Sequence, residues 1–350
     1  MSDIEWTEET WNPVRGCKPV SPGCAHCYAE PLTARLEAMG HAGYAGLTKI
    51  GAGSKKRLWT GEFREVPEML SVPLRRRKPT TWFVNSMSDL FGEGVSDGFI
   101  LDVFRIIAEC PIHTFQILTK RPTRMRAWFE RWADVDEEGL DPIMARGPAA
   151  VRAAHKTQRA HLFAEMIEKW AATHGGSPPD GMAFPTYDWM AGMRWWPTVF
   201  RNAWLGVSIE DRAHGLPRID ELRKVPAAIR FLSVEPLLED LGTIDLTDIH
   251  WVIVGGESGP GARPFDLAWA RSIVAQCRAA NVPCFVKQLG AKPVENLTVT
   301  GNFRTHKGRR QLEMRVDPVR LVDRKGGDMS EWPEDLRIRE YPRAYRAGAR

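Results

Sequence analysis

The stretch from Arg230 to Ser258, RFLSVEPLLEDLGTIDLTDIHWVIVGGES, contains two short apolar runs that each end in polar residues. The runs Arg230–Val234 and His250–Val254 have the length of strands and are rich in β-branched and aromatic residues. Strands without polar alternation are typical of a parallel sheet that is covered on both faces. The stretch therefore predicts two neighbouring parallel strands, with Glu235 and Glu257 just beyond their carboxyl ends.

Similar runs occur on both sides of this stretch. They are Trp11–Val14, Thr81–Asn85, His113–Leu118, Ala203–Val207 and Pro283–Lys287. Helical patterns lie between them, for example Phe99–Ile107 after a candidate N-cap at Ser96, and Trp269–Cys277 after Asp266. Strands that alternate with helices predict an α/β fold, either a wound parallel sheet or a parallel (β/α) barrel of the TIM type. Seven runs leave open whether the barrel is partial or complete.

Two segments interrupt the alternation and suggest a division of the chain. Residues 133–198 are too long for an ordinary loop between strand and helix, and they contain a helical pattern and a cluster of tryptophans. We interpret them as a helical insertion, in which the tryptophans form either a lid or the insertion's own small core. Residues 291–350 are polar and Arg-rich and are interpreted as a C-terminal extension. The barrel would then comprise residues 1–132 and 199–290.

Composition limits the class of protein. No apolar run approaches the roughly 20 residues that cross a bilayer, and the N-terminus MSDIEWTEET lacks the features of a signal peptide. We therefore expect a cytoplasmic protein without a membrane partner. The net charge of +4 is too small to indicate nucleic-acid binding. The local basic clusters at 55–57, 75–78 and 307–310 could bind phosphates or could be solvated surface.

Three cysteines lie close together in the stretch Trp11–Ala29, WNPVRGCKPVSPGCAHCYA. Cys17, Cys24 and Cys27 have the spacing C-x6-C-x2-C, and the surrounding prolines and glycines predict a loop. Three thiolates would leave one iron of a [4Fe–4S] cluster without a protein ligand. A zinc ion would need a fourth ligand, and His26 is placed awkwardly for that role between Cys24 and Cys27. The pattern favours an iron–sulfur cluster, with zinc or unliganded thiols as the alternatives.

The other three cysteines are scattered through the chain. Cys110 ends a helical pattern, Cys277 lies on an apolar helix face and Cys284 opens a strand. Buried free cysteine is the usual state for such positions.

Nearly every expected strand ends in a polar cluster. The clusters are Asn85, Ser86, Ser88 and Asp89; Thr119, Lys120 and Arg121; Ser208, Glu210 and Asp211; Ser233 and Glu235; Gly255, Gly256, Glu257 and Ser258; and Lys287 and Gln288. In a parallel barrel the reactive groups gather at these carboxyl ends. Any single cluster could instead cap the next helix. We take Lys120, Glu235, Glu257 and Lys287 as candidate catalytic residues, and the paired glycines as positions where a ligand can approach the backbone.

Several of these segments together resemble a known family. WNPVRGC, SPGCAHCYAE, NSMSDLF, ILTKRP, WLGVSIED, FLSVEPLLED and VIVGGESGPGARP are similar to the phage- and prophage-associated three-Cys-motif proteins of unassigned function. The resemblance covers about residues 4–290, and that family in turn resembles the radical S-adenosylmethionine superfamily. The superfamily's usual spacing is C-x3-C-x2-C, so this loop has three extra residues between its first two cysteines.

The resemblance implies a cofactor and a set of roles. Cys17, Cys24 and Cys27 would hold a [4Fe–4S] cluster whose open iron binds S-adenosyl-L-methionine, and an electron from an external donor would then yield a 5′-deoxyadenosyl radical. His26 would stand beside the adenine.

Further residues would meet other parts of the same cofactor. Asn85, Ser86 and Asp89 would meet the methionine amino group. Ser233 and Glu235 would meet the ribose. The segment with Gly255, Gly256 and Glu257 would pack near the adenine.

Three functions are compatible with these observations. The first is a radical enzyme that acts on a nucleic acid or a nucleotide-like substrate, with a site that a partner protein could complete. The second is a non-enzymatic phage or prophage protein in which a metal staples a DNA- or RNA-binding module. The third is an ordinary barrel enzyme that uses Lys120 or Lys287 as a base or a Schiff-base residue.

Overall fold

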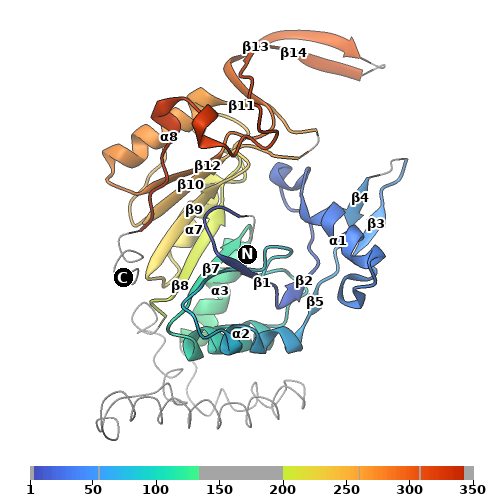
Figure 1. Cartoon of the computed structure of the whole chain (residues 1–350), viewed down its shortest axis with the longest axis vertical. Coiled ribbons are helices and arrows are strands. Elements are labelled where there is room, and N and C mark those ends of the chain that lie inside the picture. The colour runs from blue at the N-terminus through green and yellow to red at the C-terminus, as the bar shows by residue number, and fades with distance from the viewer. Residues whose placement is uncertain (1–3, 54–55, 134–199, 260, 307–308, 343–350) are drawn as a thin grey trace, which may run out of the picture.

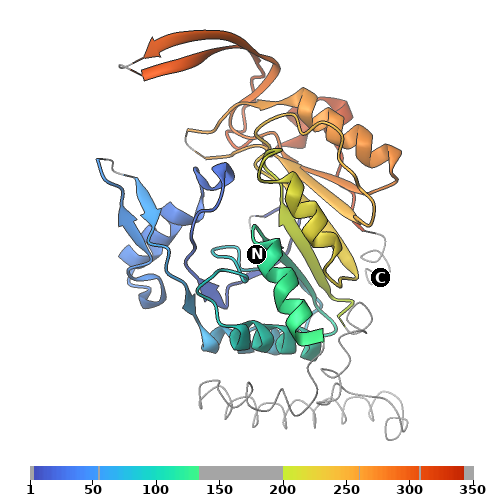
Figure 2. The same cartoon turned by 180° about the vertical axis from the view of Figure 1, so that it is seen from behind.

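The computed structural model describes residues 4–53, 56–133, 200–259, 261–306 and 309–342 (Figures 1 and 2). Its centre is a seven-stranded parallel sheet whose strands are paired in chain order. The strands are β1 (Glu9–Trp11), β6 (Thr81–Val84), β7 (Thr114–Thr119), β8 (Ala203–Ser208), β9 (Ile229–Val234), β10 (Trp251–Gly255) and β12 (Cys284–Gln288). The sheet curls into a half barrel that begins at β1 and ends at β12. The predicted parallel α/β fold is confirmed, and the barrel is partial.

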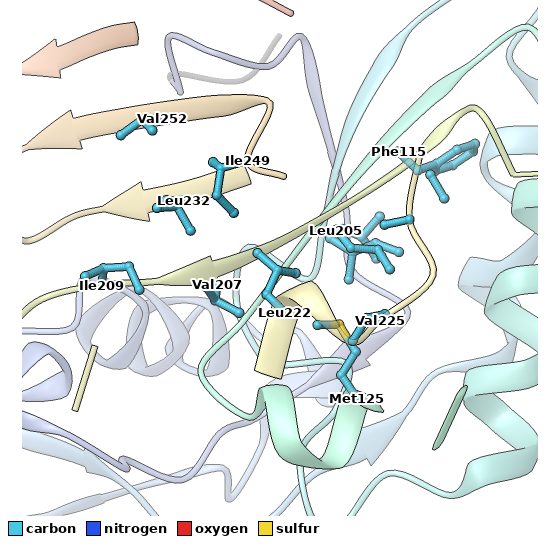
Figure 3. Packing of buried hydrophobic residues seen from close by; sticks show 14 of the residues in the cluster. Phe115, Met125, Leu205, Val207, Ile209, Leu222, Val225, Leu232, Ile249 and Val252 are labelled. Atoms are coloured by element: carbon cyan, nitrogen blue, oxygen red, sulfur yellow. The ribbon is translucent and has the colours of Figure 1, made fainter. Parts of the chain in front are cut away.

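Helices cover the convex face of the sheet. They are α2 (Asp97–Glu109), α3 (Pro122–Ala133), α7 (Leu216–Arg223) and α8 (Leu267–Ala279). Leu205 and Val207 of β8 pack toward Leu222 of α7 in the main core (Figure 3). The side chain of Ser96 accepts a hydrogen bond from the Phe99 amide at 3.2 Å, so the predicted N-cap is confirmed. The Asp266 side chain caps α8 in the same way.

The first strand differs from its prediction of Trp11–Val14. Strand β1 ends at Trp11, and Val14 belongs to β2 (Val14–Arg15), which pairs with β5 (Arg64–Glu65) in a separate antiparallel sheet. Pro13 has no N–H to donate to a ladder. The next amide, that of Val14, donates to the Asn85 side chain at 3.1 Å. The chain therefore leaves the barrel three residues earlier than the apolar pattern indicates.

A small lobe, defined here as residues 13–66, separates β1 from β6. It contains β2, α1 (Ala29–Ala38), β3 (Thr48–Ile50), β4 (Arg57–Trp59), β5 and the 3-10 helices Pro22–Cys24 and Ala42–Tyr44. Its own core includes Leu47 and Trp59, and Cys17 and Cys27 pack against that core. Two further 3-10 helices, Pro67–Ser71 and Pro73–Arg75, lead back to the barrel. The polar sequence of the lobe does not predict its short strands.

The chain after β12 forms a second small sheet and then returns to the barrel. Strands β11 (Phe265–Asp266), β13 (Pro293–His306) and β14 (Arg309–Pro318) form that sheet, and the hairpin of β13 and β14 projects from the body in Figures 1 and 2. The 3-10 helices Met329–Glu331 and Glu334–Leu336 follow.

Beyond these helices the chain runs along the free edge of β12. The amide of Val286 donates to the Ile338 carbonyl at 2.8 Å, and the amide of Glu340 donates to the Cys284 carbonyl at 2.9 Å. This pairing covers the edge of the sheet. The predicted insertion at 133–198 lies almost entirely outside the described residues.

Aromatic side chains fill much of the concave face. This aromatic layer consists of Trp6, Phe83, Trp204, Phe231, Trp251 and Phe285. The ring centroids of Trp6 and Phe83 are 4.7 Å apart, and Trp251 is fully buried. Tyr341 stacks on Trp251 from the C-terminal segment. Because this layer occupies the face nearer the amino ends of the strands, the carboxyl ends are left for polar side chains.

A candidate cofactor site at the mouth of the half barrel

The cysteine loop, defined here as Cys17–Cys27, carries the three thiols. All three are partly exposed and unpaired, whereas the other three cysteines are buried. Burial, together with nearby charge on Asp89, Cys27 and Cys24, raises the pKa of Cys17 to about 12, although Arg121 opposes the shift. The three sulfur atoms are therefore close enough to feel one another's charge. A positive centre between them would favour their thiolate forms.

The first end of the loop is fixed by Arg121. Its guanidinium donates to the Lys18 carbonyl at 2.7 Å and to Asp89 Oδ2 at 2.9 Å, and it contacts the Cys17 side chain. Asp89 also accepts from Thr119 Oγ1 at 2.7 Å. Both Asp89 and Arg121 are buried. The pair ties the start of the cysteine loop to the carboxyl ends of β6 and β7.

The middle of the loop rests on Glu210, just beyond β8. A Cβ atom on Gly23 would lie 3.1 Å from Glu210 Cδ, so the loop backbone passes close to the carboxylate. Arg218 Nη1 donates to Glu210 Oε2 at 2.6 Å, and Lys120 Nζ lies 3.6 Å from the same oxygen. Burial alone would raise the pKa of Glu210, but Lys120 and Arg218 outweigh it and the pKa is lowered. Glu210 is therefore a buried anion beneath the loop.

The far end of the loop reaches the end of β10. His26 Nδ1 lies 2.9 Å from Glu257 Oε2, which also accepts from the Arg263 amide at 2.8 Å. Burial would raise the pKa of Glu257, but the hydrogen bonds from Arg263 and His26 outweigh it and lower the pKa. The structure thus brings His26 and Glu257 together. Arg263 was not among the expected site residues, because its position in a loop six residues past Glu257 gives no signal in the sequence.

Glu235 and Lys287 form a second carboxylate–lysine pair on the concave face. Lys287 Nζ lies 2.6 Å from Glu235 Oε1, and Gln288 Nε2 donates to the same oxygen at 3.2 Å. The Lys287 and Glu235 side chains are 15% and 18% exposed, so a ligand in the mouth could reach them. At Gly256 a Cβ atom would lie 2.9 Å from the Leu289 carbonyl oxygen. Packing against the chain itself therefore requires glycine at that position.

The residues after β6 hold the base of the lobe. Asn85 has a positive φ of 60°, and its Oδ1 accepts from Val14. Among the described residues, its buried Nδ2 is one of the side-chain atoms without a hydrogen-bond partner. Ser86 Oγ donates to Asn12 Oδ1 at 3.2 Å. Ser233 is buried on β9 in register with Ser208, on the face that carries the lysine–glutamate pairs.

The expected site residues thus lie around one mouth, but they do not form a ready site for a single ion. Within the part of the chain that the structure describes, no three His, Cys, Asp or Glu groups are placed to hold one metal ion. Two cavities, of about 290 and 710 Å³, lie elsewhere, beside α8. Arg121 anchors the cysteine loop, a role that the sequence does not predict. Its position two residues past β7 was the available signal.

Comparison with known proteins identifies a family, but no protein of known function or structure. A family model described as "Protein of unknown function (DUF5131)" matches residues 1–315. No curated protein and no solved structure matches the chain. None of the described helices combines the length and the apolar character needed to cross a bilayer. Because the family match covers far more than half of the sequence, the protein belongs to the DUF5131 family of unknown function.

Proposed function

We propose that the chain is a radical S-adenosylmethionine enzyme in which Cys17, Cys24 and Cys27 hold a [4Fe–4S] cluster. The observation that carries this proposal is the position of the cysteine loop. Its thiols are the partly exposed ones, and the loop is fixed to the carboxyl ends of β6, β7, β8 and β10. When bound, the cluster and S-adenosylmethionine would supply a reactive carbon radical.

The donor set fits a cluster better than a single ion. Zinc needs four ligands that converge on one point, and no such group of His, Cys, Asp or Glu is found among the described residues. In a [4Fe–4S] cluster each cysteine binds a different iron. The three sulfur atoms therefore surround a larger centre and need not point at one ion. The guanidinium of Arg121 beside Cys17 would offset part of the negative charge of three thiolates.

Polar groups around the mouth can bind the small molecule. The buried, unpartnered Nδ2 of Asn85 can donate to a carboxylate or hydroxyl oxygen. The carboxylates of Glu235 and Glu257 can accept from ammonium or ribose hydroxyl groups. In this proposal Ser86 and Ser233 offer hydroxyl groups to the same molecule, and Asp89 holds the backbone amides of Phe91 and Lys120. Gly255 lies beside Glu235.

Two lysines can donate or accept a proton near the reacting substrate. Lys120 lies beside Glu210, and Lys287 lies beside Glu235. The Lys120 and Lys287 side chains are 18% and 15% exposed, so each Nζ can hold or release a proton toward a substrate atom in the mouth. The aromatic layer below them excludes water from the floor of the site, since each of its members is buried.

We further propose a nucleic acid or nucleotide-like substrate and a phage or prophage origin, both on the strength of the family resemblance. The basic cluster Arg75–Lys78 offers no support, because it lies before β6, at the amino end of the barrel. The side chains of the cluster at 307–310 lie outside the described residues.

Metal and product analysis tests the proposal. Protein purified without oxygen should contain about four iron and four sulfide per chain and absorb broadly near about 400 nm. With reductant and S-adenosylmethionine it should release 5′-deoxyadenosine. Cys24→Ala should lose both the cluster and 5′-deoxyadenosine formation. The matched control is Cys110→Ala, which changes the buried C-cap residue of α2 and should retain both. Protein that holds zinc without iron or sulfide would contradict the proposal.

A further inference from the structure

The positive charge of the chain is concentrated in the lobe. Residues 13–66 contain eight Lys and Arg against four Asp and Glu, a net charge of +4. The whole chain also has +4, so the remaining residues balance to zero, with forty charges of each sign. One of the lobe's four acids, Glu30, is 1% exposed. Its carboxylate lies 3.8 Å from Lys56 Nζ, so Glu30 balances one cation of the same lobe and the lobe keeps its excess of four positive charges.

Exposed apolar side chains are concentrated in the same lobe. Seven large hydrophobic residues are exposed in the described part of the chain, and five of them lie between residues 20 and 50: Val20, Tyr28, Leu32, Met39 and Ile50. The other two, Ile112 and Val322, lie far apart in the sequence. Single exposed apolar residues are normal, but a concentration of them on a small lobe is typical of an interaction surface.

Helix α1 and its two cap residues place three of these hydrophobic residues in one row with Arg35. Tyr28, Leu32, Arg35 and Met39 follow the spacing i, i+4, i+7 and i+11, which places them on one face of the helix. We name this row the α1 stripe. The opposite face of α1 packs on the lobe core. The Tyr28 hydroxyl donates to the Ser86 carbonyl at 2.5 Å, so the stripe begins at the mouth of the barrel.

We propose that the α1 stripe is the docking surface for an acidic, low-potential iron–sulfur protein that delivers the electron. The inference rests on the proposed function, because it gives the electron a route to the cysteine loop. Tyr28 follows Cys27 directly in the chain, so a carrier seated on the stripe comes close to a cluster ligand. One electron leaves the reduced cluster of the carrier and reduces the cluster of this chain by one electron, and no atom is transferred.

The chemistry of the stripe decides between two classes of partner. Leu32 and Met39 offer aliphatic surface, which an apolar interface core on another protein would cover. A nucleic acid presents phosphates and base faces, which bind cations and aromatic rings and gain little from Leu or Met. Arg35 within the stripe and Lys49 on the neighbouring strand β3 are exposed and would attract an acidic protein face.

Reduction kinetics test the proposal. The probe is a plant-type [2Fe–2S] ferredoxin, an acidic carrier of about −400 mV. It is reduced with dithionite, separated from the excess reductant and mixed with the cluster-loaded enzyme. Reduction should slow steeply as salt rises, because the steering is electrostatic. The double variant Leu32→Asp, Met39→Asp should reduce the rate constant at least tenfold, because it places two negative charges against an acidic face. Reduction by dithionite should be unchanged in the same variant.

The chain supplies a matched control. Ile112→Asp, Val322→Asp alters the two exposed hydrophobic residues outside the lobe, 54% and 89% exposed, and should leave ferredoxin reduction as in the wild type. Equal rates of reduction by ferredoxin for this control and for the lobe variant Leu32→Asp, Met39→Asp would overturn the proposal. A rate that does not depend on salt would also overturn it. So would a lobe variant that loses affinity for a DNA oligonucleotide but keeps its reduction rate.

The two proposals can fail separately. If the wild type contains no iron, the proposed function fails, and calorimetric titration of ferredoxin onto the same protein still tests docking. If the cluster is present and dithionite supports 5′-deoxyadenosine formation while ferredoxin neither binds nor reduces the enzyme, the docking proposal alone fails.

Discussion

The concave face of the half barrel has two halves built from the same alternation of side chains. Near the amino ends of the strands, inward positions carry the aromatic layer, in which Trp204 and Trp251 lie 5.9 Å apart. Near the carboxyl ends, inward positions carry the pairs Lys120–Glu210 and Lys287–Glu235. One half buries apolar area, and the other places charges beside the cysteine loop.

The aromatic layer stabilises the fold, whereas the charged residues of the mouth position the cysteine loop. The aromatic layer is closed by segments from both ends of the chain, Trp6 and Tyr341, so it depends on long-range packing. The mouth is held by charged hydrogen bonds to one loop. We therefore expect substitutions in the layer to cost stability, and most substitutions in the mouth to cost cofactor binding.

The largest expected effect is at Trp251, in the middle of the layer. Trp251→Ala should lower the free energy of unfolding by about 3–5 kcal/mol, because it removes a fully buried side chain and leaves a cavity. Lys287→Ala, on the other half of the same face, should change it by only about 1 kcal/mol. Urea denaturation checks both. If the two variants lost similar free energy of unfolding, the aromatic layer and the mouth would not differ in their contribution to stability.

Among the residues of the mouth, we expect Arg121 to contribute most to the stability of the fold. Arg121→Met leaves Asp89 buried without its cation, which should cost about 3 kcal/mol and weaken iron retention. Arg121→Lys should recover part of both losses, since it restores charge without the planar fork. The control Arg126→Met removes a more exposed ion pair and should cost about 1 kcal/mol or less. Full iron content in Arg121→Met would contradict the anchoring role of this residue.

A smaller effect is expected at Gly23. A Cβ atom there would lie 3.1 Å from Glu210 Cδ, so Gly23→Ala should push the loop away and cost about 1 kcal/mol, with partial loss of iron. The control Gly98→Ala adds a Cβ atom with nothing within 4 Å, inside helix α2, and should be neutral or slightly stabilising. Thermal unfolding and iron analysis compare the two variants. Identical iron contents would argue that the loop is not seated on Glu210.

The smallest effect is the pH dependence of Glu210. Its pKa is lower in the folded protein than the ordinary value of 4.5, so its charged form stabilises the fold above pH 4.5. That contribution is lost as the pH falls through the folded pKa. The wild type should therefore exceed Glu210→Gln in stability at pH 7, and the difference should shrink below pH 4.5. A difference that stays constant with pH would show that Glu210 is not a buried anion.

Much of the barrel is predictable from local pattern, and most of the lobe is not. Runs such as Thr81–Asn85 and Arg230–Val234 are apolar without alternation, which is typical of parallel strands, and Ser96 and Asp266 are ordinary helix caps. The lobe strands β3 and β4 have three residues each and contain Lys49 and Arg57, so no periodicity marks them.

The site was predictable in position but not in its contacts. The rule that polar residues gather at strand ends places Glu235, Glu257 and Lys287 at one mouth. It does not reveal that Arg121 reaches Lys18 or that Arg263 holds Glu257. These contacts depend on how the lobe folds over the barrel, and no local pattern contains that information. The same holds for the C-terminal pairing along β12.

The most direct test of the account is whether a small molecule binds the open iron. Electron paramagnetic resonance of the reduced protein should change when S-adenosylmethionine is added. With 17O in the methionine carboxylate, electron–nuclear double resonance should detect coupling between that oxygen and the cluster. A reduced cluster whose spectrum is unchanged, with no coupling to the labelled carboxylate, would contradict the account.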